Sequence, residues 1–282
     1  MGTPVGFIGL GNMGLPMALN LCAPEFDLQV YDVNPATAET VIARGGRCAA
    51  SVAELAAASS LICLCVRDDA DVNAVMMGPS GIIAQAAPKT AVAIHSTVQP
   101  ATVRAVAAAA ALRQIDVVDA PITGGAEGAR ARTLAYMVGG ADTVIDRFRP
   151  VFAASGSTVV AAGALGAGMV LKLCNNLITY LELIAAHESL HLARSAGVSM
   201  EALVALTTAN GGMTKTMLAF LENRTHGPAK YGEATMRRAF ESFAGIAEKD
   251  LDCALGTAAD CGVELPAGTL ARQLIRDVYL AR

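Results

Sequence analysis

A lysine and two asparagines interrupt an otherwise apolar part of the sequence. Lys172 is the only formally charged side chain between Pro150 and Leu181, and Asn175 and Asn176 follow it three and four residues later. If residues 167–195 form one helix, these side chains share a face. A lysine in a desolvated cleft disfavours its ammonium form, which suits the amine for proton transfer. The pattern predicts that Lys172 is a general acid/base and that Asn175 and Asn176 orient a polar ligand.

The alternative is a lysine whose aliphatic stem crosses the helix surface while its amine stays in water. That arrangement would leave two consecutive asparagines of an apolar helix in need of hydrogen-bond partners. We therefore favour the proton-transfer interpretation.

A glycine-rich turn near the start of the sequence predicts a dinucleotide site. Gly9, Gly11 and Gly14 form G-x-G-x-x-G between a strand-like and a helix-like run, and Asp32 follows eighteen residues after Gly14. The glycines permit a tight turn and close approach of a pyrophosphate, while a carboxylate after the next strand can accept hydrogen bonds from both adenosine ribose hydroxyls. Asp32 would also repel a 2′-phosphate, so we expect NAD in preference to NADP.

Two further loops could contribute to a site at the same edge of the sheet. Thr97 lies in "STVQP" (96–100), at the end of a predicted strand, although this loop could simply cap a helix. Thr123, Gly124 and Gly125 lie in "DAPITGG" (119–125), where a hydroxyl and backbone N–H groups could bind a carboxylate. A plain glycine turn is the alternative for the second loop.

The elements that would position these residues fall into two regions. Short β-rich runs alternate with alanine-rich helical runs up to residue 163, at 5–10, 28–33, 61–66, 91–97, 116–123, 133–140 and 157–163. This alternation predicts a Rossmann-type, mostly parallel sheet covered by helices. From residue 164 the patterns are helical, with breaks expected at 209–214 and 226–232. We expect an α/β domain over 1–163 and an all-helical domain for substrate binding and oligomerisation over 164–282, beginning with a long interdomain helix.

Composition excludes several classes of function. Of the 282 residues, 54% are hydrophobic and 16% charged, which is typical of a globular chain with large cores. The formal charge of −4 gives no basic surface for nucleic acid. The apolar stretches contain glycine and proline, and the start shows no signal sequence, so we expect no membrane span and a cytoplasmic location. Apolar helical faces in the second region favour a homodimer or homotetramer.

One motif suggests a metal site. "HESLH" (187–191) fits H-E-x-x-H, which on a helix can present two zinc ligands. No third ligand forms a known zinc arrangement with His187 and His191, so we interpret them as part of a structural helix face and expect no metal.

The sequence resembles the β-hydroxyacid dehydrogenase family, which includes 3-hydroxyisobutyrate dehydrogenase and tartronate semialdehyde reductase. Four segments carry the resemblance in the family's order: "GFIGLGNMGLPMALNL", "DAPITGGAEGA", "GAGMVLKLCNN" and "EKDLDCAL". The resemblance implies hydride transfer between NAD and C3 of a small 3-hydroxy acid, such as a hydroxyisobutyrate, glycerate, tartronate semialdehyde, threonate or serine. It implies a lysine acid/base at Lys172, supported by Asn176.

The resemblance also implies roles for other positions. Substrate contacts would come from Thr97, Thr123, Gly124, Gly125 and Asn175, and cofactor contacts from Gly9, Gly11, Asn12, Met13, Gly14, Asp32, Val66, Thr97 and Lys249. The chain departs from the family pattern at Arg67, Arg132 and Lys215, which leaves the substrate's identity open. A non-catalytic NAD-binding regulatory module and an imine-reductase-like relative are the alternatives.

Overall fold

The computed structural model describes residues 2–280, which form two compact units divided after Lys172. The division falls inside one long helix, α9 (Ala167–Ser195), whose bounds agree with the helix that the sequence predicts. The domain boundary after residue 163 that the sequence suggests stays a prediction.

The first unit is built on a sheet of nine strands in the order β3-β2-β1-β4-β5-β6-β8-β7, with β9 paired to β8. Strands β1 to β6 run parallel, and β8 is antiparallel to β6 and β7. The strands are β1 (Thr3–Ile8), β2 (Phe26–Tyr31), β3 (Arg47–Cys48), β4 (Leu61–Leu64), β5 (Ala91–Ile94), β6 (Asp116–Asp119), β7 (Ile122–Thr123), β8 (Leu134–Gly139) and β9 (Gly156–Gly163). The expected Rossmann-type fold with a mostly parallel sheet is confirmed.

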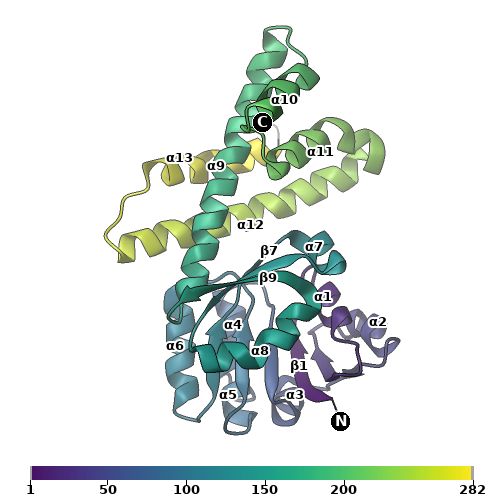
Figure 1. The fold of residues 1–282 in the computed structure, drawn as a ribbon, viewed down its shortest axis with the longest axis vertical. Helices are drawn as coiled ribbons and strands as arrows, with labels where there is room; N and C mark the ends of the chain where they lie inside the picture. The colour runs from purple at the N-terminus through teal and green to yellow at the C-terminus, as the bar shows by residue number, and fades with distance from the viewer. Residues whose placement is uncertain (1, 281–282) are drawn as a thin grey trace. The chain divides into compact units, whose positions relative to one another are not determined.

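Helices cover both faces of this sheet, as Figure 1 shows. Alternate strand residues point to opposite faces, so Phe7 and Cys63 belong to one core while Ile8 and Leu64 belong to the other. The helical elements are α1 (Gly14–Asn20), the 3₁₀ turn η1 (Pro35–Ala38), α2 (Glu39–Ile42), α3 (Val52–Ala58), α4 (Asp69–Met77), α5 (Ile82–Gln85), α6 (Pro100–Ala111), α7 (Gly125–Ala131) and α8 (Asp142–Ser155).

Among its described residues, the second unit contains helices joined by short loops and no strand. After α9 come α10 (Met200–Ala209), α11 (Lys215–Tyr231), α12 (Glu233–Asp260) and α13 (Pro266–Leu280). Figure 1 shows α13 lying alongside α12. Their core joins Tyr180 and Leu183 of α9 to Leu251 of α12 and Ile275 of α13.

The structure differs from the sequence prediction at two segments. The expected strand 116–123 is two strands, β6 and β7, separated by Ala120 and Pro121, and proline has no N–H for a continuous ladder. The two-residue β3 was not predicted. The break expected at 226–232 is present at its last residue: α11 ends at Tyr231 and α12 begins at Glu233, with Gly232 at a φ of 87° between them, while Pro228 lies inside α11.

Among the described residues, α9 is long and apolar enough, by length and composition, to cross a membrane. Core helices of globular proteins meet the same criteria, and 39% of the most apolar window of α9 is buried in the structure.

Candidate functional site

The carboxyl ends of five parallel strands form one row. Strand register aligns Ile8 with Tyr31 and Leu64, Leu64 with Ile94, and Ile94 with Asp119. The loops that carry the predicted cofactor residues of the first unit leave the sheet from this row. Open α/β sheets bind ligands at this edge, so the register brings together the residues that the sequence assigned to separate motifs.

The turn after β1 needs glycine for packing at two positions and leaves open space at the third. Gly9 has a φ of 93°, and a Cβ there would lie 2.2 Å from the Cys65 carbonyl oxygen. A Cβ on Gly14 would lie 1.9 Å from the Gly9 carbonyl oxygen. By contrast, a Cβ on Gly11 would meet nothing within 4 Å. Gly11 and the exposed Asn12 therefore leave the turn accessible to a ligand.

The first turn of α1 has no side-chain cap. Met13 occupies its N-cap position, and no side chain accepts a hydrogen bond from the backbone there. This leaves the adjoining backbone N–H groups available to an anion.

Asp32 is fixed against the glycine turn. Its Oδ2 accepts a hydrogen bond from the backbone N–H of Leu10 at 2.6 Å, and its Oδ1 accepts one from Asn34 N–H at 2.8 Å. A carboxylate has about four lone-pair positions, so Asp32 can still accept hydrogen bonds from two ribose hydroxyls. The following residue, Val33, is 90% exposed and places no positive charge beside this carboxylate.

The loops after β4 and β5 are joined by a hydrogen bond. The Val66 N–H donates to the buried Ser96 hydroxyl at 2.8 Å. Thr97 follows and is partly exposed. Asp69 Oδ1 accepts from Gln99 N–H at 2.9 Å and from the Thr102 hydroxyl at 2.6 Å, which orders the start of α6.

The loop from Thr123 to Gly125 contains two glycines with positive φ. Gly124 has a φ of 121° and Gly125 a φ of 65°, and both are exposed. Gly124 is the N-cap of α7, and no side-chain acceptor binds the N–H groups of the first turn. Thr123 is partly exposed at the end of β7, so its hydroxyl and these N–H groups belong to one short segment.

A buried carboxylate binds the start of the helix that carries Lys172. Asp119 is fully buried; its Oδ1 accepts from Gly166 N–H and its Oδ2 from Met169 N–H, both at 2.7 Å. Burial raises the pKa of Asp119, and the surrounding backbone N–H groups, including that of Gly168, oppose the rise. Lys172 follows Met169 by three residues and is half-buried.

This packing requires glycine at position 168. A Cβ on Gly168 would lie 2.4 Å from the Met137 carbonyl oxygen and 2.8 Å from Asp119 Oδ2. Glycine at this position therefore allows α9 to begin in direct contact with the sheet edge.

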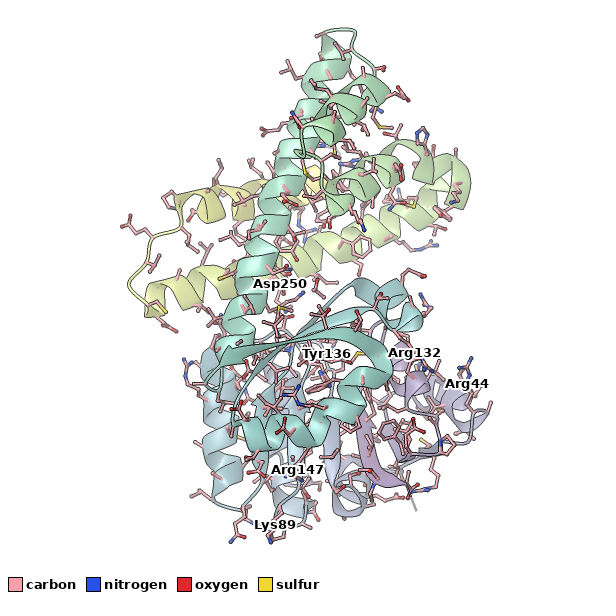
Figure 2. All side chains as sticks on the ribbon, in the orientation of Figure 1. Arg44, Lys89, Arg132, Tyr136, Arg147 and Asp250 are labelled. Carbon is pink, nitrogen blue, oxygen red and sulfur yellow. The ribbon has the colours of Figure 1, made fainter. Side chains whose placement is uncertain are left out.

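In the second unit, Asp250 binds the asparagine pair. Asp250 is 3% exposed, and its Oδ2 accepts from Asn176 Nδ2 at 2.7 Å and from the Tyr180 hydroxyl at 2.9 Å. Asn176 Oδ1 in turn accepts from Asn175 Nδ2 at 3.2 Å. Figure 2 labels Asp250 on α12 beside α9. Asp250 therefore supplies part of the hydrogen bonding that the buried asparagine pair requires.

Lys249 belongs to the same cluster. Its Nζ lies 2.9 Å from Asp250 Oδ1, in an ion pair that does not meet hydrogen-bond geometry. Burial and the neighbouring Asp250 charge raise the pKa of Tyr180 well above its usual range, so this hydroxyl stays a donor. The candidate substrate residue Asn176 and the candidate cofactor residue Lys249 therefore contact one carboxylate.

The histidine pair stands apart from these groups. His187 and His191 lie one turn apart on α9, with ring centroids 6.4 Å apart. Within residues 2–280, no group of three or more His, Cys, Asp or Glu side chains is arranged to hold a metal ion.

Comparison with known proteins identifies the family. Residues 4–163 match the NAD binding domain of 6-phosphogluconate dehydrogenase, and residues 166–281 match the NAD-binding domain of NADP-dependent 3-hydroxyisobutyrate dehydrogenase. The chain belongs to the β-hydroxyacid dehydrogenase family. As a member, it is an oxidoreductase that acts on CH–OH donors, with a nicotinamide cofactor.

Relatives from this family align over nearly the whole chain. The NAD-dependent L-serine dehydrogenase of Pseudomonas aeruginosa is 31% identical over 96% of this chain and 91% of its own. The 3-hydroxyisobutyrate dehydrogenase of the same organism is 32% identical with the same coverage. A solved structure of 3-hydroxyisobutyrate dehydrogenase from Mycobacterium tuberculosis with L-serine has a TM-score of 0.82 at 29% identity, and the match covers 98% of this chain and 93% of that one.

Sequence reasoning missed two carboxylates in this β-hydroxyacid dehydrogenase. Asp119 begins the quoted segment "DAPITGG", and Asp250 follows Lys249 in "EKDLDCAL". For Asp119 the available signal was an acidic residue at the end of an apolar run, because such a group needs hydrogen-bond partners when buried. Asp250 has charged neighbours in the sequence and gave no such signal. The identity of those partners required the fold.

Proposed function

We propose that this protein transfers a hydride between NAD and C3 of a small 3-hydroxy acid, with Lys172 as the general acid/base. The observation that supports this most is the position of Lys172 on α9. Asp119 accepts a hydrogen bond from the first turn of this helix, and Asp250 orients Asn176 four residues after Lys172. Lys172 and Asn176 are four residues apart on α9, so one helix face presents an amine and an ordered amide.

The reaction follows from the chemistry of these groups. The cofactor supplies the hydride acceptor. The neutral amine of Lys172 would take the proton of the C3 hydroxyl as the hydride leaves C3, and both transfers would reverse in the reducing direction. Asn176 and Asn175 would orient the substrate. Lys249 would act at the nicotinamide end of the cofactor.

The loop from Thr123 to Gly125 would hold the substrate's carboxylate. Its two positive-φ glycines and the uncapped first turn of α7 offer backbone donors, and Thr123 adds a hydroxyl. A carboxylate held at one end fixes the distance of C3 from the base, which is how binding lowers the barrier to reaction. The relatives named for L-serine and 3-hydroxyisobutyrate support this substrate class.

Asp32 favours NAD over NADP. A 2′-phosphate would bring negative charge to a carboxylate that Leu10 and Asn34 already hold in place. Pyrophosphate contacts would come from the turn containing Gly9, Gly11, Asn12, Met13 and Gly14, and further cofactor contacts from Val66 and Thr97.

The test is a substrate panel with the wild-type enzyme and Lys172→Ala. We expect the wild type to reduce NAD+ with at least one of 3-hydroxyisobutyrate, glycerate, threonate or serine. Lys172→Ala should lower kcat by about 10²–10⁴-fold, the usual contribution of a positioned acid/base, while NADH binding measured by its fluorescence persists. Lys230→Ala, on the exposed end of α11, is the matched control. A kcat unchanged in Lys172→Ala would remove the assignment.

We further propose that the protein is a cytoplasmic homodimer or homotetramer. Apolar side chains on the second unit's helices remain uncovered in one chain: Ile178 is 60% exposed, Leu192 72% and Leu206 66%. Light scattering on the purified enzyme should give the mass of two or four chains. The mass of one chain would contradict this part of the proposal.

A further inference from the structure

The first unit contains a buried charge that the proposed reaction does not use. Asp119 is the last residue of β6 and is fully buried, yet it lies only four residues before Thr123. A buried carboxylate is costly unless hydrogen bonds stabilise it. Its partners are the backbone N–H groups of Gly166, the residue before α9, and of Met169 in the first turn of that helix.

Two glycines close the space around this carboxylate. A Cβ on Gly139 would lie 2.5 Å from Asp119 Oδ1 and 2.8 Å from the Ala164 carbonyl oxygen. A Cβ on Gly168 would lie 2.8 Å from Asp119 Oδ2. The carboxylate is therefore bounded by backbone on both sides, which allows one position for the start of α9 relative to β6 and β8.

The same segment of chain leads to the proposed substrate loop. Asp119 holds the start of α9, and the loop from Thr123 to Gly125 begins four residues after Asp119. Lys172 lies three residues beyond Met169, about 4.5 Å along the helix axis. A shift in the first turn of α9 would therefore move the Lys172 amine relative to the loop that holds the carboxylate of the substrate.

We propose that Asp119 is a positioning residue for catalysis, which sets the distance between the Lys172 amine and the carboxylate-binding loop by capping the first turn of α9. The proposal rests on the function proposed above. Displacement of a catalytic group by about 1 Å can cost about 10²-fold in rate, so the effect should appear in kcat and in the KM for the hydroxy acid. Cofactor affinity should be unaffected.

Three variants of the full-length enzyme test this inference. Asp119→Asn keeps the size of the side chain but turns an NH₂ group towards one of the backbone N–H donors, so one hydrogen bond is lost. Gly168→Ala leaves Asp119 intact and displaces the helix by steric contact. Ser51→Ala removes a cap of the same kind from α3, where the Ser51 hydroxyl accepts from Glu54 N–H at 3.1 Å.

We expect Asp119→Asn and Gly168→Ala each to lower kcat by about tenfold or more, with the NADH dissociation constant within about twofold of the wild-type value. Ser51→Ala should lower the melting temperature and leave kcat unchanged. Hydrogen exchange should be faster in Asp119→Asn for a peptide covering 164–172 and unchanged for one covering α3.

The outcomes separate this inference from the proposed function. A wild-type enzyme inactive on every hydroxy acid would remove the proposed function. An active wild type whose Asp119→Asn and Gly168→Ala variants keep wild-type kcat and KM would overturn the positioning role alone. Unchanged hydrogen exchange of the peptide covering 164–172 in Asp119→Asn would also overturn the positioning role. If Asp119→Asn fails to fold, the kcat and KM of Gly168→Ala, compared with those of the wild type, decide whether the role holds.

Discussion

The amide of Asn176 donates to Asp250 Oδ2 at 2.7 Å, and this bond joins two helices at residues separated by 74 positions in the chain. The same oxygen accepts from Tyr180, and Lys249 lies against the other oxygen. One buried carboxylate thus orients the proposed substrate-binding amide and holds the proposed cofactor-binding lysine.

Replacement of Asp250 should damage both stability and turnover. Asp250→Ala leaves the Asn176 and Tyr180 donors buried without an acceptor, so we expect the free energy of unfolding to fall by about 1–3 kcal/mol. We also expect kcat to fall, because Asn176 loses its orientation. Tyr180→Phe is the matched control: it removes one donor, costs about 1 kcal/mol and should leave kcat near the wild-type value. Urea unfolding followed by circular dichroism, together with steady-state kinetics, measures both effects. A larger loss of kcat in Tyr180→Phe than in Asp250→Ala would contradict the expectation.

The glycine turn offers a pair of substitutions with opposite effects. Gly11→Ala adds a methyl group where nothing lies within 4 Å, so the free energy of unfolding should change by less than about 0.5 kcal/mol. NADH binding should weaken by about tenfold or more, because the methyl group occupies space for the pyrophosphate. Gly14→Ala places a Cβ 1.9 Å from the Gly9 carbonyl oxygen and should destabilise the protein by about 1–3 kcal/mol. Thermal melting and NADH titration of the two variants distinguish the roles. Equal NADH affinity in Gly11→Ala and wild type would show that the cofactor does not approach this position.

The sequence predicted those helices and turns that apolar periodicity and local motifs determine. Helix α9 was expected over 167–195 and has those bounds, because apolar spacing continues through it without a breaker. The break expected at 226–232 occurs at Gly232, because Pro228 near the end of α11 removes only one N–H and the helix continues to Tyr231. Asp250 could not be paired with Asn176 from the sequence because the contact depends on how α9 packs on α12.

Asp32 should control the choice between NAD and NADP. Asp32→Ala removes the acceptor for the ribose hydroxyls, and since hydrogen bonds to charged groups contribute about 1.5–3 kcal/mol each, the KM for NAD+ should rise by about tenfold or more. A second change, Val33→Arg, adds a guanidinium at a position that is 90% exposed in the chain and should improve the use of NADP+ in the Asp32→Ala background. Glu39→Gln, an acidic residue in the first turn of α2, is the control. An unchanged ratio of kcat/KM for the two cofactors in the double variant would exclude Asp32 from the ribose site.

His95 should make the stability of the first unit depend on pH. It is 3% exposed and packs against Phe7, Tyr136 and Phe152. Its Nδ1 lies 2.8 Å from the Ala120 carbonyl oxygen, which can only accept, so Nδ1 carries the proton and donates it. Burial lowers the pKa of His95 from 6.5 to about 4, so the folded protein keeps the ring neutral. The unfolded chain takes up the proton at higher pH than the folded one. The contribution of His95 is therefore fully present above about pH 6.5 and is lost as the pH falls towards 4.

The size of this effect follows from the pKa difference. One pKa unit corresponds to about 1.4 kcal/mol, so the loss should reach roughly 3 kcal/mol at the acid end of the window. Urea unfolding at a series of pH values should show this slope in the wild type and a smaller slope in His95→Phe, which keeps the ring packing but cannot titrate. His191→Asn, at an exposed position of α9, should retain the wild-type slope. If His95→Phe and wild type lose stability equally between pH 6.5 and 4, the acid sensitivity arises from other groups, because only the titration of His95 separates the two proteins in that window.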